Sequence, residues 1–136
     1  MKPLIPFGKT KAFNPEKVEY IRKEKSGDGH IINIYLENSA IESFYNSEEK
    51  MDDQFDIILS MFSDNKIVLV PFGTDQSIGI NPNKICSISK FNNDDKNSLE
   101  ISLTTHKLSK TFESHESRDN EYKVLLKLTS NFGDLQ

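Results

Sequence analysis

The 136-residue sequence predicts an α+β fold made of two tandem β-β-β-β-α units, and three observations lead to this prediction. The chain contains an internal repeat. Each copy of the repeat has a segment in which apolar and polar residues alternate, which is typical of a half-buried antiparallel strand. Each copy then changes to the apolar spacing of a helix. We therefore expect two antiparallel sheets, each covered on one face by one helix.

The repeat is visible as two short motifs and a long gapless alignment. The tripeptide Pro-Phe-Gly occurs at residues 6–8 and again at 71–73, and Asn-Pro occurs at 14–15 and again at 81–82. From residue 14 to residue 62 the first copy aligns with residues 81–129 at a constant offset of 67, and about a dozen positions are identical. This internal duplication predicts a first unit at residues 1–65 and a second at 66–136. A single unit of this size would bury only a marginal core, so we expect both to pack as one compact, pseudo-two-fold domain.

Four strands are expected in each unit. The first is the short apolar run that ends at Pro-Phe-Gly, at residues 4–7 and 67–72. The second follows the Asn-Pro turn, at residues 18–25 and 84–91. The third has the clearest alternation, with Ile32, Ile34 and Leu36 in one copy and Leu99, Ile101 and Leu103 in the other. The fourth is expected at residues 40–45 and 107–112.

A helix is expected at the end of each unit. The apolar residues with helical spacing are Met51, Phe55, Ile58, Leu59 and Phe62 in the first copy and Tyr122, Leu125 and Leu126 in the second. Acidic residues crowd the start of the first helix, where the helix dipole favours them. Asn46 with Glu49 has the spacing of a capping box at this start.

The side chains that carry catalysis or bind metal ions are few and scattered. The single cysteine, Cys86, falls within an expected strand, and we expect it to be a buried or half-buried structural cysteine. The histidines His30, His106 and His115 have no partner at metal-ligand spacing. The chain contains no glycine-rich phosphate loop. We therefore expect a protein that is not an enzyme, with no catalytic residues, no metal site and no cofactor.

The sheet face that the first helix leaves open is the candidate binding surface. Its expected residues include Asn33, Tyr35 and Phe44, with Lys23 and Lys25 at the end of the neighbouring strand. Aromatic rings can stack on bases and lysines can neutralise phosphates, so these five residues are a candidate nucleic-acid-binding site. The alternative is that Tyr35 and Phe44 pack in the contact between the two copies or in an oligomer.

Two tandem β-β-β-β-α units in one chain resemble the architecture of the Pur-alpha and whirly-type families. This resemblance covers nearly the whole chain as an order of elements, without a shared sequence motif. It implies a pseudo-symmetric domain that binds single-stranded nucleic acid through its sheets.

Two functions remain open at this point. The first is non-enzymatic binding of single-stranded nucleic acid through an open sheet face. The alternative is a protein-interaction or assembly module, with a protein partner or a homo-oligomer and no nucleic-acid role. The net charge of −4 speaks against nucleic acid, whereas the lysines of the first strands favour it. No apolar run is long enough for a membrane span and the start of the chain lacks a signal-peptide pattern, so a cytoplasmic protein is expected.

Overall fold

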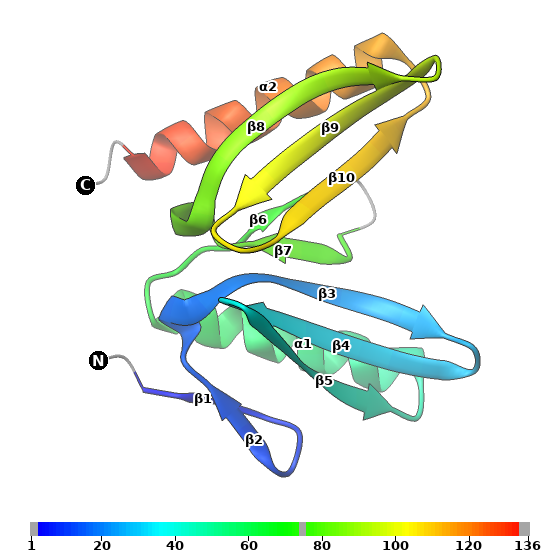
Figure 1. Cartoon of the computed structure of the whole chain (residues 1–136). Coiled ribbons are helices and arrows are strands. Elements are labelled where there is room, and N and C mark those ends of the chain that lie inside the picture. The colour runs from blue at the N-terminus through cyan, green and yellow to red at the C-terminus, as the bar shows by residue number, and fades with distance from the viewer. Residues whose placement is uncertain (1–2, 74–75, 134–136) are drawn as a thin grey trace.

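The computed structural model describes residues 3–73 and 76–133, without the side chains of residues 26, 93 and 130–133 (Figure 1). The fold is α+β, with two helices and with antiparallel pairing between all the described neighbouring strands. The predicted fold class is therefore confirmed at this level. Within the described residues, neither helix is long and apolar enough to cross a membrane.

In the first half of the chain, residues 1–65, the described residues form five strands and a helix. In chain order these are β1 (Ile5–Phe7), β2 (Lys11–Phe13), β3 (Val18–Ser26), β4 (Gly29–Leu36), β5 (Ser39–Tyr45) and α1 (Glu48–Asp64), with a 3₁₀ turn η1 (Pro15–Lys17) before β3. The N-cap of α1 is Ser47, whose hydroxyl accepts a hydrogen bond from the Lys50 N–H at 3.2 Å. The expected capping box at Asn46 is therefore wrong by one residue, because the serine hydroxyl takes the N-cap position.

The second half, residues 66–136, has the same order of elements. These are β6 (Val70–Pro71), β7 (Ile78–Ile80), η2 (Pro82–Lys84), β8 (Ile85–Asn93), β9 (Lys96–Leu103), β10 (Lys107–Phe112) and α2 (His115–Gly133). The expected first strands at residues 4–7 and 67–72 correspond to β1 and β6, and each is followed by a short strand that was not expected, β2 or β7. Each Pro-Phe-Gly ends in a glycine with positive φ, 66° at Gly8 and 93° at Gly73, which lets the chain leave the strand direction there.

The described strands form three sheets with the orders β1-β2, β5-β4-β3-β7-β6 and β10-β9-β8. The five-stranded sheet therefore contains strands of both halves, because β7 pairs with the outer edge of β3. The expectation of one separate sheet per copy is wrong for this reason. A strand edge presents unpaired N–H and C=O groups, and β7 satisfies those of β3.

The strand pairing does not confirm the expected pseudo-two-fold packing. A two-fold axis that placed β7 on β3 would also place β2 on β8. In the described part of the chain, however, β8 pairs only with β9 and β2 pairs only with β1. Only one of the two equivalent pairings, that of β7 with β3, therefore forms among the described strands. The hairpin β1–β2 and strand β8 lie at opposite ends of the molecule (Figure 1).

The register within the two halves is the same pair for pair. Ile21 lies opposite Ile34 and Ile88 lies opposite Ile101, both shifted by the offset of 67 that the sequence alignment has. A bulge interrupts β3 between residues 18 and 20 and β8 between residues 85 and 87. The short hairpins also agree, since Pro6 pairs with Ala12 as Pro71 pairs with Gly79.

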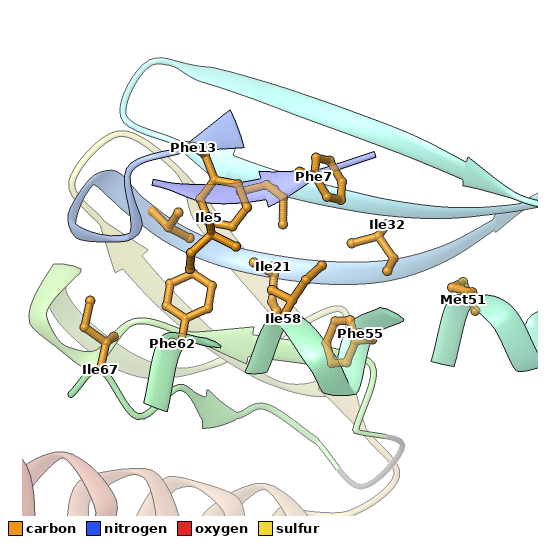
Figure 2. Packing of buried hydrophobic residues seen from close by; sticks show 12 residues of the cluster. Ile5, Phe7, Phe13, Ile21, Ile32, Met51, Phe55, Ile58, Phe62 and Ile67 are labelled. Atoms are coloured by element: carbon orange, nitrogen blue, oxygen red, sulfur yellow. The ribbon is translucent and has the colours of Figure 1, made fainter. Parts of the chain in front are cut away.

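Each half has its own apolar core between its helix, its three long strands and its short hairpin. Figure 2 shows the core of the first half. The first core includes Phe7 and Phe13 of the hairpin, whose ring centroids are 6.0 Å apart, and Phe62 of α1, 5.8 Å from Phe13. The second core includes Phe72, Ile80 and Leu125, and it also takes in Tyr20 from the first half. The second core therefore extends across the contact between the halves.

Candidate functional site

Polar and aromatic side chains gather at the joint between the halves, where β3 meets β7. The backbone pairs of this joint are Tyr20 with Ile80, Ile21 with Gly79 and Arg22 with Ile78. Two more hydrogen bonds extend the ladder, from Lys23 N–H to the Ser77 carbonyl at 2.8 Å and from Asn81 N–H to the Glu19 carbonyl at 2.9 Å. The second half thus adds a strand to the first sheet.

Asn81 anchors the start of η2 to β3. Its side chain is 1% exposed, its Nδ2 donates to the Val18 carbonyl at 2.9 Å, and its Oδ1 accepts from the Asn83 N–H at 3.1 Å. Both ends of the amide are therefore satisfied inside the joint. Asn14 is the counterpart of Asn81 in the first half, and its Oδ1 likewise accepts a hydrogen bond from the backbone N–H two residues later, that of Glu16, at 2.9 Å.

A buried carboxylate holds the turn between β9 and β10. Glu19 is fully buried, and it accepts hydrogen bonds from the backbone N–H of Thr105 at 2.8 Å, from that of His106 at 3.1 Å, and from the Thr105 hydroxyl. A buried N–H group left without an acceptor costs free energy, so these bonds favour the observed conformation of the turn. The sequence did not single out Glu19, because a glutamate in a strand that aligns with Cys86 carries no distinguishing pattern.

Three rings of the joint pack on one another. Tyr20 and Tyr35 are stacked with centroids 4.1 Å apart, and the His106 ring meets both edge-on at 6.0 and 5.5 Å. Nε2 of His106 lies 2.8 Å from the Leu36 carbonyl, which can only accept, so this nitrogen donates. Burial, and then the neighbouring phenol, raise the pKa of Tyr20, while burial and Glu24 raise that of Tyr35. Both phenols are therefore uncharged at neutral pH.

An ion pair closes the outer side of the joint. Nζ of Lys84 lies 2.8 Å from Oε1 of Glu37, and Lys17 lies at 3.9 Å from the same carboxylate. The hydrogen bond from Lys84 and its charge lower the pKa of Glu37. Next to this pair, the Asn38 N–H donates to the Thr105 hydroxyl at 2.9 Å.

The two lysines predicted for a nucleic-acid site lie on the helix side of the first sheet. Lys23 pairs with Ile32 of the first core, and its Nζ is 3.0 Å from Oδ1 of Asp52 and 4.9 Å from the centre of the Phe55 ring. Lys25 is exposed and lies two residues further along β3, so its side chain is on the same face as that of Lys23. The expectation that Lys23 borders the open face is therefore wrong. Side chains two residues apart in a strand lie on the same face, so Lys23 lies on the face of the buried Ile21.

The other three predicted residues lie on the opposite face. Asn33 is 9% exposed and donates from Nδ2 to the Glu24 carboxylate, and the Tyr35 hydroxyl donates to the same carboxylate at 3.2 Å. Phe44 is 66% exposed on β5. The structure thus does not bring the five residues together. Tyr35 packs in the contact between the halves, as the alternative interpretation of the sequence had it.

The polar side chains of the joint hold two parts of the chain together. The carboxylates, amides and phenols of the joint are bonded to one another and to the backbone. Cys86 is exposed on β8, so the expectation that it is buried or half-buried is wrong. Within residues 3–73 and 76–133, no three His, Cys, Asp or Glu side chains gather in a way that could hold a metal ion.

Comparison with models of protein families, with curated proteins and with solved structures finds no significant match for this chain.

Proposed function

We propose that this protein is a non-enzymatic protein-interaction or assembly module that binds its partner by adding a strand to a sheet edge. The observation that carries this proposal is the edge of β8, which is open over nine residues in the described part of the chain. Its counterpart β3 has the corresponding edge covered by β7. Strand addition at an open edge is a recurrent way in which proteins bind extended segments of their partners.

We further propose that the chain arose by tandem duplication of a β-β-β-β-α unit, in which the first strand forms a hairpin with an additional short strand. The identical register in both halves and the gapless alignment support this. A duplicated unit has two equivalent edges. One is used within the chain, which leaves the other for an interaction outside it.

The interaction proposal is tested by light scattering on the purified protein and by pull-down with wild-type protein and an Ile88→Pro variant as baits. The N–H of Ile88 is expected to point to the open edge, as the N–H of its counterpart Ile21 points to Gly79 in the joint. The proline therefore removes an edge donor without removing a bond to β9. We expect an oligomer or a specific partner that the variant loses. A monomer that captures nothing, or a partner that both baits capture equally, would contradict the proposal.

Binding of single-stranded nucleic acid is a second candidate, and the exposed ring of Phe44 favours it. Fluorescence anisotropy with single-stranded oligonucleotides at low salt tests this function. We expect salt-sensitive binding that Phe44→Ala weakens, with Val68→Ala as a control on an exposed apolar residue elsewhere. No binding at about 50 μM protein would exclude it, since non-specific binding to nucleic acid is commonly tighter than this.

A further inference from the structure

We propose that the open edge of β8 binds the N-terminal hairpin β1–β2 of a second copy of this chain, head to tail, in the way that β3 binds β7 inside the molecule. This inference rests on the proposed function as an interaction module and names the partner. The two surfaces lie at opposite ends of the molecule, so each copy can offer one end to each neighbour (Figure 1).

The backbone carries the first part of the inference. In the joint, the backbone groups that pair with β3 belong to Gly79 and to residues 77 and 81, which lie two positions before and after it. Their counterparts on the other hairpin are Thr10, Ala12 and Asn14, and β2 has no partner other than β1 among the described strands. If the backbone hydrogen bonds of the β3–β7 joint form again at positions shifted by 67 residues, they join Ala12 to Ile88, Asn14 N–H to the Cys86 carbonyl, and Lys90 N–H to the Thr10 carbonyl.

Two exposed leucines carry the second part independently. In the joint, Leu69 before β6 and Leu59 of α1 are both partly buried and pack against the first core. Their counterparts by position are Leu4 before β1 and Leu126 of α2, which are 52% and 42% exposed. A hairpin docked on β8 as β6–β7 docks on β3 would bring Leu4 of one copy to Leu126 of the next. Both exposed side chains would then leave water.

Three side chains by which the first half locks the internal joint have no equivalents at the open edge of β8. Glu19 is replaced by Cys86, Tyr20 by Ser87, and Glu37 by Thr104. We therefore expect the contact between copies to be weak and reversible, whereas the internal joint is permanent. A contact between two different surfaces of one chain forms rings if it closes and filaments if it does not.

Disulfide trapping tests the register of this contact. Arg22 and Ile78 form a pair without mutual hydrogen bonds in the joint, and their counterparts are Ser89 and Lys11, which are both exposed. Cα atoms of such a pair are about 4.5 Å apart, within the range of a disulfide. We mix the variants K11C/C86S and S89C/C86S at about 0.5 mM total protein, because small contacts are weak, and oxidise them under mild conditions.

A disulfide-linked heterodimer is expected in this mixture at a yield at least tenfold above that of K11C/C86S mixed with S109C/C86S. Ser109 is exposed on β10, at the other edge of the same sheet, and is the matched control. The doubly substituted R22C/I78C protein, in the C86S background, is the positive control because its cross-link forms within one chain. Equal yields in the two mixtures would overturn the inference.

A second measurement tests the leucine contact. Leu126→Asp in the S89C/C86S protein is expected to lower the cross-linking yield at least fivefold, whereas Val124→Asp, at a 49% exposed position of the same helix, leaves it unchanged. If the cross-link fails but Ile88→Pro still abolishes capture of another protein, the partner is not a second copy and the interaction function stands. If neither occurs, both proposals fail.

Discussion

The two halves of this molecule share one backbone frame and differ in the side chains that meet at the joint. Strand pairing and bulge repeat from β3–β4 to β8–β9 at the same offset. At the positions of Glu19, Tyr20 and Tyr35, however, the second half has Cys86, Ser87 and Ser102. A duplicated frame thus has one edge with polar and aromatic locks and one edge without them. The frame alone therefore does not determine which of two equivalent edges becomes a permanent contact.

The largest expected effect tests whether the halves fold as one unit. Phe62 and Leu125 are fully buried in the first and second cores, respectively. Replacing either by alanine removes core contacts and leaves a cavity, so we expect a loss of about 3–5 kcal/mol for Phe62→Ala and about 2–5 kcal/mol for Leu125→Ala. Because the second core includes Tyr20 of the first half, both variants should unfold in a single transition in urea. Two separate transitions would show that the halves are independent.

The next effect contrasts Glu19 with its counterpart Cys86. Glu19→Ala leaves the N–H groups of Thr105 and His106 without their buried acceptor, and we expect a loss of about 3 kcal/mol in the free energy of unfolding. Cys86 is exposed, so Cys86→Ala should change stability by less than about 0.5 kcal/mol. Urea unfolding followed by circular dichroism measures both variants. Equal losses at the two positions would contradict the assignment of Glu19 as a lock.

A smaller contrast is expected between the two asparagines. Both lose the bond to the following 3₁₀ turn on replacement by alanine, but only Asn81 also loses a buried bond to the Val18 carbonyl. We expect Asn81→Ala to cost about 1–2 kcal/mol more than Asn14→Ala, because the Val18 carbonyl is left without this donor. The difference between the two thermal midpoints is the measurement. An Asn14 variant as unstable as the Asn81 variant would rule out this difference between the halves.

The smallest effect concerns the Lys84–Glu37 pair and appears in acid. The folded-state pKa of Glu37 lies below its ordinary value of 4.5, because Lys84 bonds to the carboxylate and attracts its charge. Its contribution to stability is therefore present above pH 4.5 and is lost as the pH falls through the lowered pKa. Stability curves of wild-type protein and Glu37→Gln should differ slightly at pH 7 and converge in acid. A difference that grows in acid would contradict this sign.

Much of the fold could be predicted from the pattern of apolar residues. The strand pair around Ile34 and the helix around Phe55 follow from periods of two and of 3.6 residues, which depend only on local geometry. The short hairpins were missed because Pro-Phe-Gly leads into strands of two or three residues, too short to show a period. Of the joint, the sequence indicated Tyr35, through its place on a strand face expected to be open, and Asn81, as part of the repeated Asn-Pro motif.

The sequence by itself determined the α+β class, the repeat in residues 14–62 and 81–129, and the core positions of each half, because repetition and periodicity are properties of the chain alone. Only the tertiary structure decided that β7 joins the first sheet, that Glu19 holds a turn 86 residues away, and that Lys23 faces α1 rather than the candidate binding face. These contacts depend on which edges and faces meet in space. No local pattern encodes that meeting, because backbone groups pair in the same way at every strand edge.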